Sequence, residues 1–117
     1  MSYQVKGNTI ILTRGDTLIV KVDIIKDGAS YIPETNDEVR FALKHKAMTP
    51  DKGEYVDDEP ILTKVIPNDT LILRLESTDT KDLPFADYVY DIQITFEDGT
   101  VDTFVTASTF RLTPEVD

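Results

Sequence analysis

The strongest structural signal in the chain is the stretch YVYDIQITFEDGTVDTF, which runs from Tyr88 to Phe104. Apolar and polar residues alternate in its first half, and this period of two predicts a half-buried β-strand. One face of that strand carries Tyr88, Tyr90, Ile92, Ile94 and Phe96. Asp98-Gly99 predicts a two-residue hairpin loop, because both residue types tolerate positive φ. Such a loop pairs Phe96 with Val101, Ile94 with Thr103 and Ile92 with Val105.

The same alternation recurs upstream and predicts strands over 9–13, 18–24, 39–44, 61–66 and 71–75. Turns are expected at Gly15, Gly28 and Gly99. The stretch 47–60 contains Pro50, Gly53 and an acidic run, and we interpret it as the longest loop. One short helical turn is expected over 77–83, capped by Ser77 and ended by Pro84. A change of parity before Phe110 predicts a β-bulge near 106–108.

These signals predict one all-β domain over residues 1–117, with an ordered core at about 8–113. The fold we expect is an antiparallel immunoglobulin-like β-sandwich of about seven strands with one short helical turn. A closed barrel is the alternative, since alternation alone does not separate the two. Tyr88 follows a short turn and is our candidate for a tyrosine corner. An ordinary core or surface tyrosine is the competing interpretation.

Composition excludes several classes of function. The chain has 117 residues, a formal net charge of -10 and no cysteine. Nucleic acids and anionic membranes are therefore poor partners, because both are negatively charged. No apolar run approaches the ~20 residues that cross a bilayer, and the N-terminus lacks the pattern of a signal peptide. We therefore expect no membrane association, and folding in the cytoplasm of the cell that makes the protein.

The residue inventory argues against catalysis, so we predict no catalytic residues and no cofactor. His45 is the one histidine, and it stands between two lysines at a predicted strand end, which is typical of a solvated side chain. Zinc sites of the structural type need cysteine or several histidines. Asp51, Asp57, Asp58 and Glu59 carry oxygen ligands, but their spacing does not match an EF-hand. We predict no metal site there, and calcium binding by this acidic stretch stays an open question.

Two short motifs have ordinary structural interpretations. Arg14-Gly15-Asp16 spells an integrin-binding tripeptide, but between two apolar strands it is better explained as a turn. The aromatic stripe that begins at Tyr88 could form a platform for sugars or bases. A stripe that continues into isoleucines is more often the core face of a central strand.

A set of segments spread along the chain forms a familiar pattern, at 11–17, 37–42, 79–85, 88–93, Phe96, Asp98-Gly99 and 101–104. Together these segments resemble small tail-module proteins of phages and prophages of Gram-positive bacteria. The chain is similar to the immunoglobulin-like N-terminal domain of the baseplate upper protein family, from about Thr9 to Thr113. The 117 residues contain no counterpart of that family's fibre or receptor-binding region, which leaves open whether the protein joins a baseplate or is a free-standing decoration or adaptor protein. The resemblance implies a virion structural role without catalysis, and it brings no functional residues with it.

On this basis we expect a tail or baseplate structural or adaptor protein, made in the bacterial cytoplasm and assembled into the virion. Its partners would be other virion proteins, with a homo-oligomer as an open question. The exposed loops suggest Tyr31, Asp57, Asp58 and Glu59 as partner contacts. The alternative is a carbohydrate- or receptor-binding sandwich on the particle surface. That alternative requires an exposed aromatic cluster in a groove.

Overall fold

Regular structure in the computed structural model consists almost entirely of β-strands. The structure describes the backbone of residues 3–6, 8–49 and 53–114, and the side chains of 8–25, 27–45, 60–105 and 108–114. In chain order the elements are β1 (Tyr3–Lys6), β2 (Thr9–Thr13), β3 (Leu18–Lys21), β4 (Ile25–Lys26), β5 (Ala29–Ser30), β6 (Glu38–Thr49), β7 (Gly53–Ile66), β8 (Ile72–Leu75), α1 (Ser77–Thr80), β9 (Ala86–Thr95) and β10 (Val101–Thr113).

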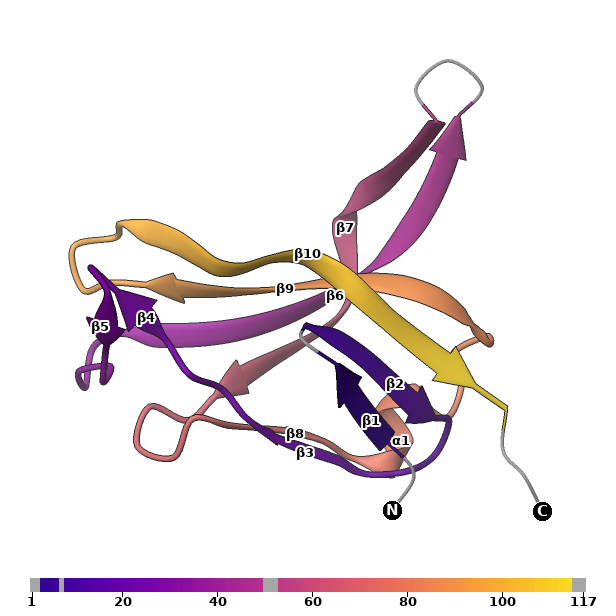
Figure 1. Cartoon of the computed structure of the whole chain (residues 1–117), viewed down its shortest axis with the longest axis horizontal. Coiled ribbons are helices and arrows are strands. Elements are labelled where there is room, and N and C mark those ends of the chain that lie inside the picture. Colours follow the sequence, from indigo (N-terminus) through magenta and orange to yellow (C-terminus); the bar gives the residue numbers. More distant parts are fainter. Residues whose placement is uncertain (1–2, 7, 50–52, 115–117) are drawn as a thin grey trace.

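The strands form two layers, as expected for an all-β sandwich. The larger sheet has the order β1-β2-β10-β9-β6-β7, and β3 pairs with β8 beneath it (Figure 1). The prediction of about seven strands omitted the short strands β1, β4 and β5. It also missed one parallel pair, in which Phe110 of β10 lies beside Ile10 of β2. Local alternation carries no signal for the relative direction of two strands from opposite ends of a chain.

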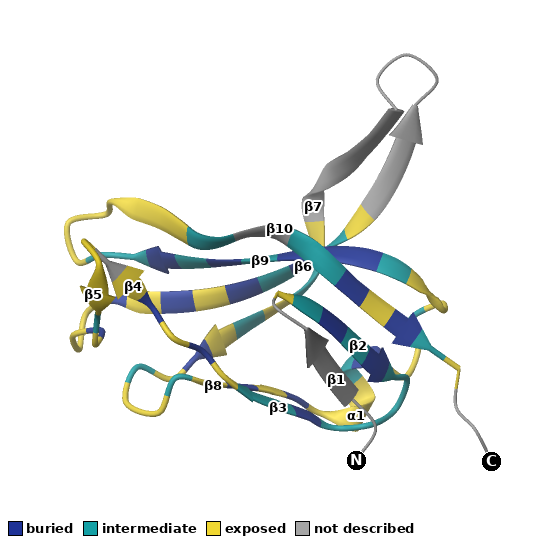
Figure 2. Cartoon of the chain, viewed as in Figure 1, coloured by how far each residue is buried: buried dark blue, intermediate teal, exposed yellow. Residues whose placement is uncertain are grey.

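The core lies between the two layers. The aromatic stripe of β9 belongs to it, because Tyr88 is 1% exposed and Tyr90 4% exposed (Figure 2). Phe41 and Phe110 pack their rings against Tyr90 at centroid distances of 5.5 and 6.4 Å. From the smaller sheet come Leu18, Leu73 and Leu75, all buried. Period-two alternation therefore identified the core face of the central strand correctly.

Tyr88 occupies a tyrosine corner. Its hydroxyl donates a hydrogen bond to the carbonyl oxygen of Pro84, at 2.5 Å. The chain is thereby tied back to the turn that precedes β9, as in immunoglobulin-like sandwiches. Burial raises the pKa of the Tyr88 hydroxyl, because the charged phenolate is costly in this environment.

The turn glycines have the backbone conformations that the sequence predicts, with φ of 86° at Gly15, 80° at Gly28 and 90° at Gly99. Asp27 also has positive φ, at 53°, so Asp27-Gly28 forms the two-residue loop between β4 and β5. This is the geometry in which both central residues are left-handed.

The hairpin at Gly99 is longer than predicted. The Phe96 N–H donates to the Thr100 carbonyl, and the Gly99 N–H donates to the Phe96 carbonyl, so three residues form the loop. The expected pairs Phe96–Val101 and Ile94–Thr103 are therefore wrong, and Val101 lies opposite Thr95 instead. The pair of Ile92 with Val105 is correct, because a register shift between Thr103 and Val105 restores the alignment. A second shift, between Val105 and Ser108, is the predicted bulge.

The helical turn is shorter than expected and has a different cap. α1 ends at Thr80, and its N-cap residue is Glu76 rather than Ser77. The Asp79 carboxylate accepts a hydrogen bond from the Glu76 N–H at 2.7 Å, which is one half of a capping box. The prediction favoured Ser77 because serine is a common cap, but the acidic residue in the first turn moves the start by one position.

Candidate interaction site

A two-stranded arm extends from the sandwich where β6 and β7 continue beyond the large sheet (Figure 1). β6 pairs with β9 only as far as His45 opposite Tyr88. It then continues to Thr49 and pairs with β7 alone, through Lys46–Val56, Ala47–Tyr55, Met48–Glu54 and Thr49–Gly53. The prediction of a loop over 47–60 is therefore wrong. Turn-forming and acidic residues in this stretch obscured a regular ladder.

An irregularity in β7 marks the base of the arm. Lys44 pairs with Pro60 and Lys46 pairs with Val56, so Asp57, Asp58 and Glu59 stand opposite His45 alone. Such an insertion bends a strand and increases its twist. Pro60 fits here because β7 is the edge strand of the sheet, where the missing N–H is tolerated.

In the register of β6 and β7, the acidic run 57–59 thus lies next to the basic run 44–46, at the point where the arm begins. Lys44 forms a salt bridge with Asp91 of β9, with 3.1 Å between its Nζ and the carboxylate. The side chains of the predicted contacts Asp57, Asp58 and Glu59 lie outside the described residues, as does residue Asp51. Among the side chains that the structure describes, no group of three potential metal ligands occurs.

Tyr31 makes contacts within its own chain. Its hydroxyl donates to the carboxylate of buried Asp37 at 2.6 Å, and the same carboxylate accepts the Glu34 N–H at 2.9 Å. The hydrogen bond to Asp37 raises the pKa of Tyr31 to about 12. The ring also packs edge-on against Phe96 at 5.9 Å. Tyr31 therefore holds the segment before β6 in place, and its hydroxyl is already engaged within the chain.

The Arg14-Gly15-Asp16 segment is a closed turn, with the Asp16 N–H donating to the Thr13 carbonyl at 3.1 Å. The Arg14 guanidinium donates to the Leu83 carbonyl and lies 4.0 Å from the centre of the Phe85 ring. No local sequence pattern indicated these contacts, because the partners are distant in the chain. They direct Arg14 toward the α1–β9 connection.

His45 is exposed at the end of the β6–β9 ladder, with its ring 5.6 Å from that of Tyr88. The exposed position agrees with a solvated strand-end histidine.

No described helix is long and apolar enough to span a membrane.

Comparisons of the chain with protein-family models, with curated proteins and with solved structures found no significant match. The functional argument therefore depends on the residues themselves.

Proposed function

We propose that this protein is a non-catalytic structural or adaptor component of a phage or prophage tail or baseplate, and that it binds other virion proteins through the β6–β7 arm. The sequence resemblance to tail-module domains supports the virion assignment. The observation that carries the binding mode is the arm itself. Beyond His45 it is a two-stranded ribbon that neither β9 nor any other described strand joins.

An isolated two-stranded ribbon is only marginally stable in water, and further strands or a packed face stabilise it. A partner surface would supply that packing. The arm carries apolar residues such as Met48 and Tyr55 together with its acidic residues. With a net charge of -10, the protein favours a partner with a basic surface.

Burial of the aromatic stripe favours the structural role over the carbohydrate-binding alternative. It requires exposed aromatic side chains in a groove, whereas Tyr88 and Tyr90 lie in the core and Phe96 packs against it. The rigid sandwich then serves to hold the arm, with the ion pair of Lys44 and Asp91 beside its base.

The test is mass spectrometry of particles purified from the strain that carries the gene. We expect peptides of this protein at levels close to those of known tail proteins, and retention of the protein through a density gradient. If complete particles form and the protein is absent from them, the virion assignment is wrong.

A further inference from the structure

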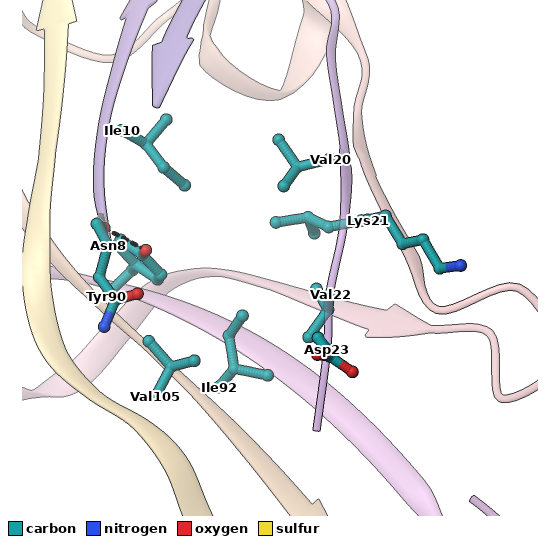
Figure 3. Close-up of a pocket in the computed structure, with 10 residues that line it drawn as sticks. Asn8, Ile10, Val20, Lys21, Val22, Asp23, Tyr90, Ile92 and Val105 are labelled. Atoms are coloured by element: carbon teal, nitrogen blue, oxygen red, sulfur yellow. Dashed lines mark hydrogen bonds between the residues drawn. The ribbon is translucent and has the colours of Figure 1, made fainter. Parts of the chain in front are cut away.

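A cavity of about 250 Å³ lies between the two layers of the sandwich, beside β3 (Figure 3). Its walls are mainly apolar, and both layers contribute to them. The large sheet supplies Ile10, Tyr90, Ile92 and Val105, and the small sheet supplies Val20 and Leu73. Because these side chains come from five strands, the packing of the two layers fixes the shape of the cavity.

The polar group inside the cavity is already engaged. The Tyr90 hydroxyl donates a hydrogen bond to the Asn8 carbonyl, as Figure 3 shows. Among the described side chains, no buried nitrogen or oxygen atom lacks a hydrogen-bond partner. A polar ligand loses its bonds to water on burial and needs partners in return. The interior therefore favours an apolar molecule.

The mouth of the cavity reaches solvent. Asn8, Lys21 and Asp23 also belong to the lining, and all three residues are exposed. In Figure 3 the Lys21 side chain points away from the cavity. The Asp23 carboxylate accepts a hydrogen bond from the exposed Ser30 hydroxyl at 3.4 Å. A ligand can therefore enter past polar residues, but no charged group anchors it within the walls.

We propose that this cavity binds one small, uncharged, mainly apolar molecule of the size of a bicyclic aromatic compound. An engineered apolar cavity of ~150 Å³ takes up benzene, so by proportion about 250 Å³ accommodates about ten heavy atoms. Sugars and nucleotides do not fit this chemistry, because their hydroxyl and phosphate groups would lose water without gaining partners. The site uses none of the arm residues, and it stands whether or not the protein belongs to a virion.

The direct test titrates the full chain with indole and follows the methyl groups by NMR. We expect saturable shifts of the methyl signals of Val20, Ile92 and Val105. The methyl signals of Val65, an exposed residue of β7 outside the cavity, should stay unchanged. Indole-3-carboxylate is the matched control ligand. Its charge should weaken binding roughly tenfold or more, because the walls offer the carboxylate no partner.

A pair of valine variants tests whether indole occupies this cavity. Val20→Phe places a ring between the walls, so the affinity for indole should fall roughly tenfold or more. Val65→Phe adds the same ring at an exposed position and should leave the affinity unchanged.

A third variant decides the matter if Val20→Phe does not fold. Val105→Ala removes two methyl groups from the wall, and 3-ethylindole is larger than indole by the same two carbon atoms. The ratio of the affinity for 3-ethylindole to that for indole should rise roughly tenfold, because a buried methylene is worth about a fourfold change in affinity.

Three results would overturn the proposal. One is the absence of saturable methyl shifts at millimolar indole. The second is equal affinity for indole and indole-3-carboxylate, which would reject the uncharged class of ligand. The third is unaltered affinity in folded Val20→Phe or an unaltered affinity ratio in Val105→Ala, since either would place the bound indole elsewhere on the protein.

Discussion

The hydroxyl of Tyr88 lies 2.5 Å from the carbonyl oxygen of Pro84, and the hydrogen bond that it donates joins the central strand β9 to the turn after α1. Tyr88 is also buried against the core, so one side chain fixes both a strand and the connection that enters it. The neighbouring Tyr90 makes a comparable bond to the Asn8 carbonyl, ahead of β2.

Tyr88→Phe should destabilise the domain by about 1 kcal/mol, because the Pro84 carbonyl loses its donor while the ring stays packed. Urea denaturation followed by circular dichroism measures this change in the free energy of unfolding. An unchanged midpoint would show that water replaces the hydroxyl at no cost.

Arg111→Ala should have a small effect in the same assay, well below that of Tyr88→Phe. Arg111 pairs with Asp87 at 2.8 Å, and this pairing raises the pKa of the arginine, but both side chains are substantially exposed. Exposed pairs contribute little because solvent screens them. A loss as large as that of Tyr88→Phe would contradict this ranking.

Gly28→Ala should cost about 1 kcal/mol, because φ at this position is 80° and an alanine there is strained. A Cβ at Gly28 meets no atom within 4 Å, so the cost is conformational rather than steric. Thermal unfolding of Gly28→Ala beside Gly28→Asn provides the check, since asparagine tolerates this conformation better. Equal midpoints for all three proteins would exclude strain at the turn.

The contact between Tyr31 and Asp37 makes stability sensitive to alkaline pH. The pKa of Tyr31 rises from 10.0 to about 12 on folding, so its contribution is complete below pH 10 and is lost as pH rises toward 12. Tyr31→Phe should therefore be less stable than the native protein at pH 8, with a difference that shrinks between pH 10 and 12. Urea titrations at several pH values test this, and a constant difference would contradict it.

The sequence alone predicted those features of the fold, a core face and two turns, that depend on a local pattern of residues. Alternation located the core face of β9, and Asp27-Gly28 and Gly99 marked their turns correctly. Pattern failed where pairing depends on distant partners. The parallel pair of β2 and β10 joins strands from opposite ends of the chain. The hydrogen bond from Arg14 to the Leu83 carbonyl joins residues that are 69 positions apart.

The candidate sites were harder to predict than the fold. The stretch 47–60 was predicted to be a loop because Pro50, Gly53 and the acidic run outweighed a short alternation. The cavity of about 250 Å³ between the two layers had no local signal at all, since its walls come from β2, β3, β8, β9 and β10 and from the segments before β2 and after β3. Only the placement of the sheets relative to each other creates it.

Removal of the arm should leave the sandwich intact. A variant in which Asn-Gly replaces residues 46–58 keeps the last pair before the arm, Lys44–Pro60. We expect its unfolding free energy to differ from that of the native protein by about 0.5 kcal/mol or less, because beyond His45 the arm pairs with none of the other described strands. A much larger loss would mean that the arm supports the sandwich.

The most direct measurement is the copy number of this protein per purified particle, by quantitative mass spectrometry. It is made in a deletion strain complemented with either the native or the armless protein. We predict native copy number near that of other tail proteins, and an armless protein that folds but is missing from the particles. Equal incorporation of both proteins would contradict binding through the arm. Absence of both from intact particles would contradict the virion role itself.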